Sequence, residues 1–112
     1  MGALHSTISA LSFSVVLTSD VAAKRFVTAA ATQAGDGEAA IGVSQYAETA
    51  GRAVSVDAVC VVDMVAGAAI PQGVHVQSDA NGLPIARTAG VINGLALTAA
   101  VNPGDIVKIL IK

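Results

Sequence analysis

The feature of this sequence that most limits its fold is the shortness of its apolar segments, which Gly, Pro, Asn and Asp interrupt repeatedly. The longest segment, residues 53–65, is rich in valine and lies between Gly51 and Gly67. β-Branched residues favour strands, and a short β-branched segment between turn residues is typical of a strand. No apolar run reaches the ~20 residues that a membrane helix needs. The sequence therefore predicts a soluble chain built from strands, without a membrane partner.

Further strands and turns follow from the same pattern. Residues 12–18, 25–31 and 106–111 have the composition of strands. Residues 74–78 and 83–87 flank a turn that contains Asn81 and Gly82, two residue types that tolerate positive φ, so we expect a hairpin there. Pro103 and Gly104 form a turn motif before the last strand, since proline presets φ and glycine follows it.

One short helix is the only helix that the sequence suggests. Ser19 or Asp20 can cap residues 21–24, because their side-chain oxygens accept the free N–H groups of a first helical turn. The predicted fold is all-β, a compact barrel or sandwich of about seven to nine short strands with at most one short helix.

The chain also contains an internal repeat of this pattern. The segment GVS at residues 42–44 precedes AGRAVSV at 50–56, and GLA at 94–96 precedes PGDIVKI at 103–109. Each copy reads as a strand, an Ala-rich loop that ends in glycine, and a second strand. Gly51 and Gly104 precede the second strands, where we expect a backbone geometry that is closed to side chains. Two copies are too few for a solenoid, so they predict one compact domain.

Charge and cysteine content exclude several functions. The chain has 12% charged residues and a formal net charge of -2, so it has no surplus of cations to neutralise nucleic acid. Cys60 is the single cysteine and lies in an apolar run, which indicates a buried thiol and a reducing compartment. The first nineteen residues contain no Lys, Arg, Asp or Glu, and the missing basic segment argues against an export signal.

No residue constellation points to catalysis, a metal or a cofactor. Asp57 and Asp63 lie six residues apart in one strand, about 20 Å from each other, and are interpreted as carboxylates near solvent. His5 and His75 have no metal-ligating neighbours at the required spacing, so both are expected on the surface. Residues 35–40 match a relaxed dinucleotide fingerprint, but a strand follows where the fingerprint needs a helix. We therefore expect neither an enzyme nor a cofactor.

The small core predicts self-association. Phe13, Phe26 and Tyr46 are the only aromatic residues, and one cysteine forms no internal disulfide. A domain of this size buries roughly 65% of its surface on folding, which leaves its stability marginal. Oligomerisation is the remaining common way in which a domain of this size gains stability.

The order of these segments resembles a known family, the small capsid decoration proteins, or head cement proteins, of tailed bacteriophages. The similar segments are KRFVT at 24–28, IGV at 41–43, AGRAVSV at 50–56, VQSDANG at 76–82, INGLAL at 92–97 and GDIVKIL at 104–110. The match runs from about Ser12 to the C-terminus. The resemblance implies a structural β module on the outer surface of the virion capsid, made in the host cytoplasm, that clamps neighbouring major capsid subunits, usually as a homotrimer. It brings no active site.

The N-terminal dozen residues depart from this resemblance. We expect residues 1–12 to form an extended arm and residues 13–112 to form a single β-rich decoration domain. The arm lacks charge and carries Leu4, Ile8 and Leu11, so it is expected to lie on a strand edge of the capsid. A frayed terminus is the alternative.

Two other functions remain open at this point. One is a different virion β module, such as a tail or spike component. The other is a non-catalytic β domain that carries a small ligand. Co-purification with tails would indicate the former, and a bound small molecule the latter.

Overall fold

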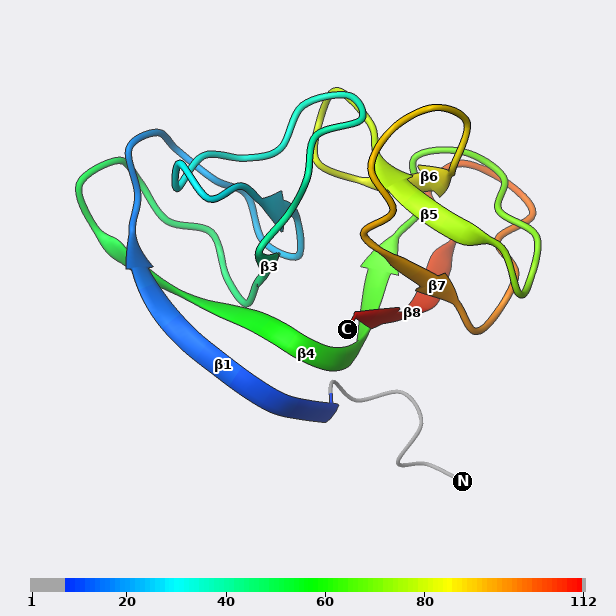
Figure 1. The fold of residues 1–112 in the computed structure, drawn as a ribbon, viewed down its shortest axis with the longest axis horizontal. Helices are drawn as coiled ribbons and strands as arrows, with labels where there is room; N and C mark the ends of the chain where they lie inside the picture. Colours follow the sequence, from blue (N-terminus) through cyan, green and yellow to red (C-terminus); the bar gives the residue numbers. More distant parts are fainter. Residues whose placement is uncertain (1–7, 112) are drawn as a thin grey trace.

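The computed structural model describes residues 8–111 of the chain, with side chains from residue 11 onward, and they form one antiparallel β-sheet (Figure 1). The eight strands of this part of the chain are β1 Ile8–Val16, β2 Phe26–Val27, β3 Gly42–Ser44, β4 Ala53–Val65, β5 His75–Ser78, β6 Pro84–Ala86, β7 Gly94–Ala96 and β8 Ile106–Ile111. Their order is β2-β3-β4-β8-β7-β5-β6, with β1 on the other edge of β4. The all-β prediction is confirmed, and the sheet curls into a nearly closed barrel.

The long strand β4 organises the sheet. Its first part pairs with β3 and its second part with β8, while β1 pairs along the opposite edge. In Figure 1 the β1–β4 pair curves along the lower left of the molecule, and β5, β6 and β7 lie together on the right. Among the described strands, β1 pairs with β4 alone, so its second edge carries no strand.

The predicted helix after Ser19 is absent from residues 8–111, and its prediction is wrong. Val21 instead exchanges two backbone hydrogen bonds of 3.0 Å with Glu48, which keeps this segment extended. Asp20 caps a different group, because its carboxylate accepts the Ala50 N–H at 2.9 Å. Tertiary pairing therefore overrides the local capping signal. Within the same residues, no helix has the length and hydrophobicity that a membrane span requires.

The expected hairpin at residues 74–87 is present as β5 and β6. The Asp79 side chain organises its turn, because Oδ1 accepts the N–H groups of Asn81 at 2.7 Å and of Leu83 at 3.0 Å. Gly82 has a φ of +75°, and its carbonyl accepts the Phe26 N–H at 2.9 Å. The hairpin tip therefore ties the second half of the chain to the first.

The repeat seen in the sequence extends through the whole described chain. We define repeat 1 as residues 8–59 and repeat 2 as residues 60–111, so that β4 crosses the boundary. The β3–β4 pair and the β7–β8 pair have the same register, with Ser44 opposite Val56 and Ala96 opposite Ile109. The bridge between Val21 and Glu48 likewise matches the bridge between Ile70 and Ala100.

Backbone hydrogen bonds outside the strands also match between the repeats. Gly51 N–H donates to the Leu17 carbonyl, and Gly104 N–H donates to the Ala66 carbonyl, both at 2.8 Å. Lys24 N–H donates to Ser44 at 2.9 Å, and Gly73 N–H donates to Ala96 at 2.8 Å. These bonds define which positions of the two repeats correspond. β1 corresponds to the second part of β4, and the first part of β4 corresponds to β8.

Candidate docking surfaces

Each repeat has two rows of side chains on opposite faces of its strands. Direct partners in an antiparallel sheet share a face, so the rows follow from the register. The core rows are Phe13, Val56 and Ser44 in repeat 1 and Val62, Ile109 and Ala96 in repeat 2. The back rows are Phe26, Val43 and Asp57 in repeat 1 and His75, Leu95 and Leu110 in repeat 2.

The back row of repeat 1 is covered by repeat 2. Phe26 and Val43 are fully buried in the larger apolar cluster, together with Val62 and Ile109 from the core row of repeat 2. The smaller cluster, which includes Val27 and Val56, lies on the other face of the same strands. The two repeats are therefore stacked, with the back of the first closing the core of the second.

The stacking leaves one open surface on each repeat. Phe13 is 41% exposed, whereas Val62, which corresponds to it in repeat 2, is fully buried. The back row of repeat 2 is open as well, because His75 is exposed and Leu95 and Leu110 are only half-buried. In the core row of repeat 1 only Phe13 is exposed, because Val56 and Ser44 are fully buried.

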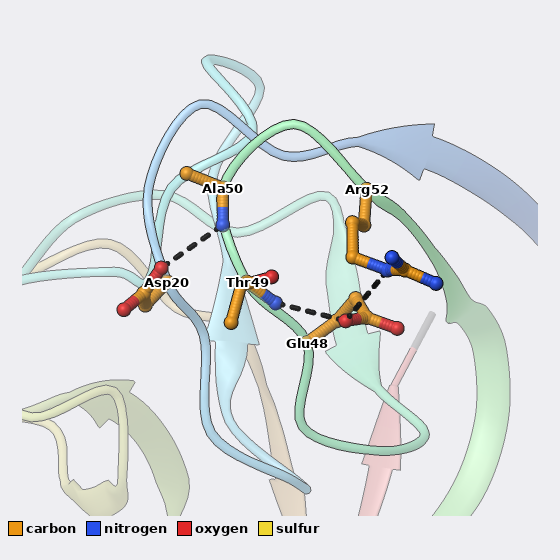
Figure 2. A network of polar contacts seen from close by, with 5 residues as sticks. All are labelled: Asp20, Glu48, Thr49, Ala50 and Arg52. Atoms are coloured by element: carbon orange, nitrogen blue, oxygen red, sulfur yellow. Dashed lines mark hydrogen bonds and ion pairs between the residues drawn. The ribbon is translucent and has the colours of Figure 1, made fainter.

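The loop ends of the two repeats differ in polarity. Figure 2 shows the end of repeat 1, where the Arg52 Nε lies 3.3 Å from a Glu48 carboxylate oxygen. The same oxygen accepts the Thr49 N–H at 3.0 Å, and Asp20 binds the Ala50 N–H (Figure 2). This end is a network of exposed polar groups beside one exposed apolar side chain, Val16, which is 63% exposed.

The matching end of repeat 2 is apolar. Val65 and Ile106 are direct cross-strand partners and are 39% and 61% exposed. Val101 in the adjoining loop is 75% exposed. The carboxylate of Asp105 holds this loop by accepting the N–H groups of Val101 at 3.1 Å and Asn102 at 3.0 Å. We call Val65, Val101 and Ile106 the apolar tip.

The arm residues from the sequence analysis are only partly within the described residues. Leu4 and the rest of residues 1–7 lie outside them. Residues 8–12 belong to β1 and pair with β4, so the extended segment begins inside the sheet. Leu11 lies opposite Val59 beside an irregularity in the register, and its side chain is 53% exposed. Leu11 therefore adds to the open surface around Phe13.

The predicted turn residues lie at loop ends of the sheet. Gly51 and Gly104 have φ angles of +87° and +92°, and a Cβ at either position would meet open space. Glycine is needed there for its backbone conformation and not for space. Pro103 is exposed beside Gly104, and Asn81 is exposed beside Gly82.

The interpretation of Asp57 as a carboxylate near solvent is wrong. Asp57 belongs to the buried back row of repeat 1, and its Oδ1 accepts a hydrogen bond of 2.8 Å from Gln45 Nε2. Its Oδ2 has no hydrogen-bond partner in the described part of the chain. Asp63 belongs to repeat 2 and pairs with Lys108 Nζ on the neighbouring strand β8 at 2.6 Å. Sequence spacing missed this difference because repeat 2 packs on the back row of repeat 1, to which only Asp57 belongs.

The Cys60 thiol is buried, as predicted, and His75 is exposed. Burial raises the pKa of Cys60 to about 11, with a further contribution from the Asp57 charge. This thiol is therefore protonated at neutral pH and is a poor nucleophile. Residues 35–40 form a loop before β3, without the helix that dinucleotide binding needs. Residues 8–111 contain no group of three or more potential metal ligands.

The comparisons with known proteins agree with the geometry. A family model described as phage cement protein matches residues 5–111. The chain belongs to the phage cement protein family. This chain is therefore a capsid-associated structural protein of the phage head, and it is located in the virion. The family resemblance found in the sequence is confirmed.

A solved structure shares the fold. It is described as the head fiber gp8.5 N base in bacteriophage phi29, with a TM-score of 0.73 and 19% sequence identity. The alignment covers 91% of this chain and 93% of the phi29 chain. A search of curated proteins finds no match. At this identity the phi29 structure shows the fold of the cement-family chain and no more.

Proposed function

We propose that this protein binds the outer surface of the assembled head, clamps neighbouring major capsid subunits as a homotrimer, and stabilises the shell against the pressure of the packaged genome. The observation that carries the proposal is the apolar tip, Val65, Val101 and Ile106, on a member of a capsid-associated family. Apolar side chains in such a group favour a partner surface over water. The equivalent end of repeat 1 has Ala53 in place of Ile106 and the Arg52–Glu48 ion pair beside it, so the backbone fold does not require the full apolar tip.

A clamp of this kind stabilises the shell by mass action. It binds only where neighbouring capsid subunits together form its site, so a broken lattice loses bound protein. One contact with a dissociation constant near 1 mM supplies only about -4 kcal/mol, but three linked contacts gain roughly 10²- to 10⁴-fold in avidity. Weak apolar contacts are therefore sufficient. Because the tip carries no charge, we expect little dependence of binding on salt.

The N-terminal arm is a second contact with the capsid in this proposal. Leu4 and Ile8 would add apolar contacts beside Leu11, and an extended arm would add main-chain hydrogen bonds to a strand edge. Deleting residues 2–7 leaves β1 complete. We expect this deletion to keep the β signal in circular dichroism and to weaken head binding, and unchanged binding would reject the arm.

The proposal is tested on heads of the encoding phage that lack this protein. Such heads should assemble but rupture at lower temperature or under osmotic shock, and purified wild-type protein should restore them. The variant Ile106→Asp should fail to restore them. Ala53→Asp is the matched control, because Ala53 is exposed at the corresponding position of repeat 1 and should tolerate the charge. Depleted heads as robust as complete ones would reject stabilisation and favour a display or adhesion role.

A further inference from the structure

The chain contains three asparagines, Asn81, Asn93 and Asn102, and the first two are each followed by glycine. An asparagine before glycine is chemically labile, because the glycine nitrogen attacks the asparagine side-chain amide and no glycine side chain blocks the approach. Asn102 precedes Pro103, whose nitrogen carries no hydrogen and does not react in this way. The sequence therefore contains two candidate sites for the same reaction.

The structure places the two candidate sites in opposite surroundings. Asn93 is 9% exposed, and its side chain is held at both ends. Its Oδ1 accepts the Ala40 N–H at 3.0 Å, and its Nδ2 donates to the Glu38 carbonyl oxygen at 3.0 Å. Asn81 is exposed at the tip of the β5–β6 hairpin, and its side-chain amide makes no hydrogen bond with the described residues. Only Asn81 therefore has an amide that is free to react.

We propose that Asn81 is a site of spontaneous deamidation. The Gly82 nitrogen attacks the Asn81 Cγ, the Cγ–Nδ2 bond breaks, and Nδ2 leaves as ammonia with the proton that the Gly82 nitrogen gives up. Water then opens the cyclic imide at one of its two carbonyl groups, which gives aspartate or isoaspartate. Water is the only reactant besides the protein. The Gly82 N–H is held by one bond of 3.2 Å to the Asp79 carbonyl oxygen, at the long end of the usual range, so little binding energy opposes the attack.

The hairpin tip that carries Asn81 also holds the two repeats together. The Asn81 carbonyl oxygen accepts a hydrogen bond of 2.7 Å from Arg25 Nη1, and the Gly82 carbonyl oxygen accepts the N–H of the fully buried Phe26 at 2.9 Å. A Cβ added at Gly82 would lie only 2.9 Å from Gln33 Cγ, so this segment is closely packed. Isoaspartate inserts an extra carbon into the main chain between residues 81 and 82, and the packing leaves no room for it.

Deamidation at Asn81 therefore releases the hairpin tip from repeat 1. The Phe26 N–H then loses its partner in a buried site, which destabilises the fold. Because copies bound in a finished virion are not replaced, the altered fraction rises with the age of the particle. This inference goes beyond the proposed clamping function and does not depend on it.

Ageing of the full native chain at mildly alkaline pH tests the site directly. Mass spectrometry of tryptic peptides measures the two asparagines separately, because Arg87 lies between them. We expect Asn81 to convert at least about tenfold faster than Asn93, since Asn93 must first break two hydrogen bonds. The same chain unfolded in guanidinium chloride is the control and should convert at both asparagines at similar rates.

Thermal unfolding of the aged protein measures the consequence. The isoaspartate form should melt about 4 °C or more below fresh protein. Asn81→Ser forms no imide and should show no such decrease after the same treatment. Asn81→Asp adds the charge without lengthening the main chain, so it should melt close to the wild type. Equal conversion of Asn81 and Asn93 in the native chain, or conversion of Asn81 only after unfolding, would overturn the site. An unchanged melting temperature of the isoaspartate form would overturn the release of the hairpin tip.

Discussion

Repeat 1 and repeat 2 have the same strand pairing but different surroundings. Phe13 and Val62 occupy matching positions, yet one is partly exposed and the other is fully buried. Likewise, the polar network of Glu48 and Arg52 in repeat 1 occupies the position that corresponds to the apolar end near Ile106 in repeat 2. The comparison teaches that a repeated backbone does not impose a repeated surface. Each repeat contributes one face to the internal contact and leaves a different face for partners.

Introducing a charge into the matching core rows should give the largest difference. Val62→Asp places a carboxylate in a fully buried apolar site, which should cost at least about 4 kcal/mol and leave little folded protein. Phe13→Asp should cost about 1 kcal/mol or less in the monomer, because the site is open to water. Urea unfolding at low protein concentration measures both. Similar losses of unfolding free energy for the two variants would contradict the conclusion that Val62 is buried while Phe13 is partly open to water.

The glycines that begin β3 and β7 should give the next largest effect. A Cβ at Gly42 would overlap the Asp57 carbonyl oxygen, and a Cβ at Gly94 would lie 2.8 Å from the Leu110 carbonyl oxygen. Gly42→Ala and Gly94→Ala should each destabilise the protein by about 2 to 3 kcal/mol, with the greater loss at Gly42. Thermal unfolding provides the comparison. A neutral substitution at either position would show that the strands separate easily there.

The Cys60 thiol at the junction of the repeats should make stability depend on alkaline pH. Its pKa is raised from 9.0 to about 11, so the unfolded chain loses this proton first. Its contribution is therefore complete below pH 9 and declines as pH rises through about 11, by roughly 2 to 3 kcal/mol in all. Cys60→Ala is the control, whose free energy of unfolding should fall less over this range. If the free energy of unfolding changed with pH in the same way for both proteins, ionisation of the Cys60 thiol would not be the cause of the decline.

The loop glycines should show the smallest effect and no difference between repeats. Gly51→Ala and Gly104→Ala place a Cβ in open space but at a positive φ, so each should cost about 1 kcal/mol. Equal decreases in melting temperature would indicate that the two loop ends are equivalent in backbone energy. A loss at Gly104 alone would instead mark the apolar tip as the more constrained end.

Much of this architecture could be predicted from the sequence. Valine-rich segments between turn residues indicate an all-β chain, because branched side chains and turn chemistry act locally. The spacing of Gly42 and Gly51 against Gly94 and Gly104 also revealed the repeat, and the family resemblance lay in the same segments. These are properties that neighbouring residues determine by themselves.

The tertiary structure decided what the local pattern could not. The segment after Ser19 carries a helix-capping signal, but pairing between Val21 and Glu48 keeps it extended. Asp57 and Asp63 look alike in the sequence, yet only Asp57 is buried, because repeat 2 packs on its row. The same packing buries Val62 and leaves Phe13 open. Burial depends on which distant strands cover a face, so only the folded chain determines which apolar side chains form the core and which remain for partners.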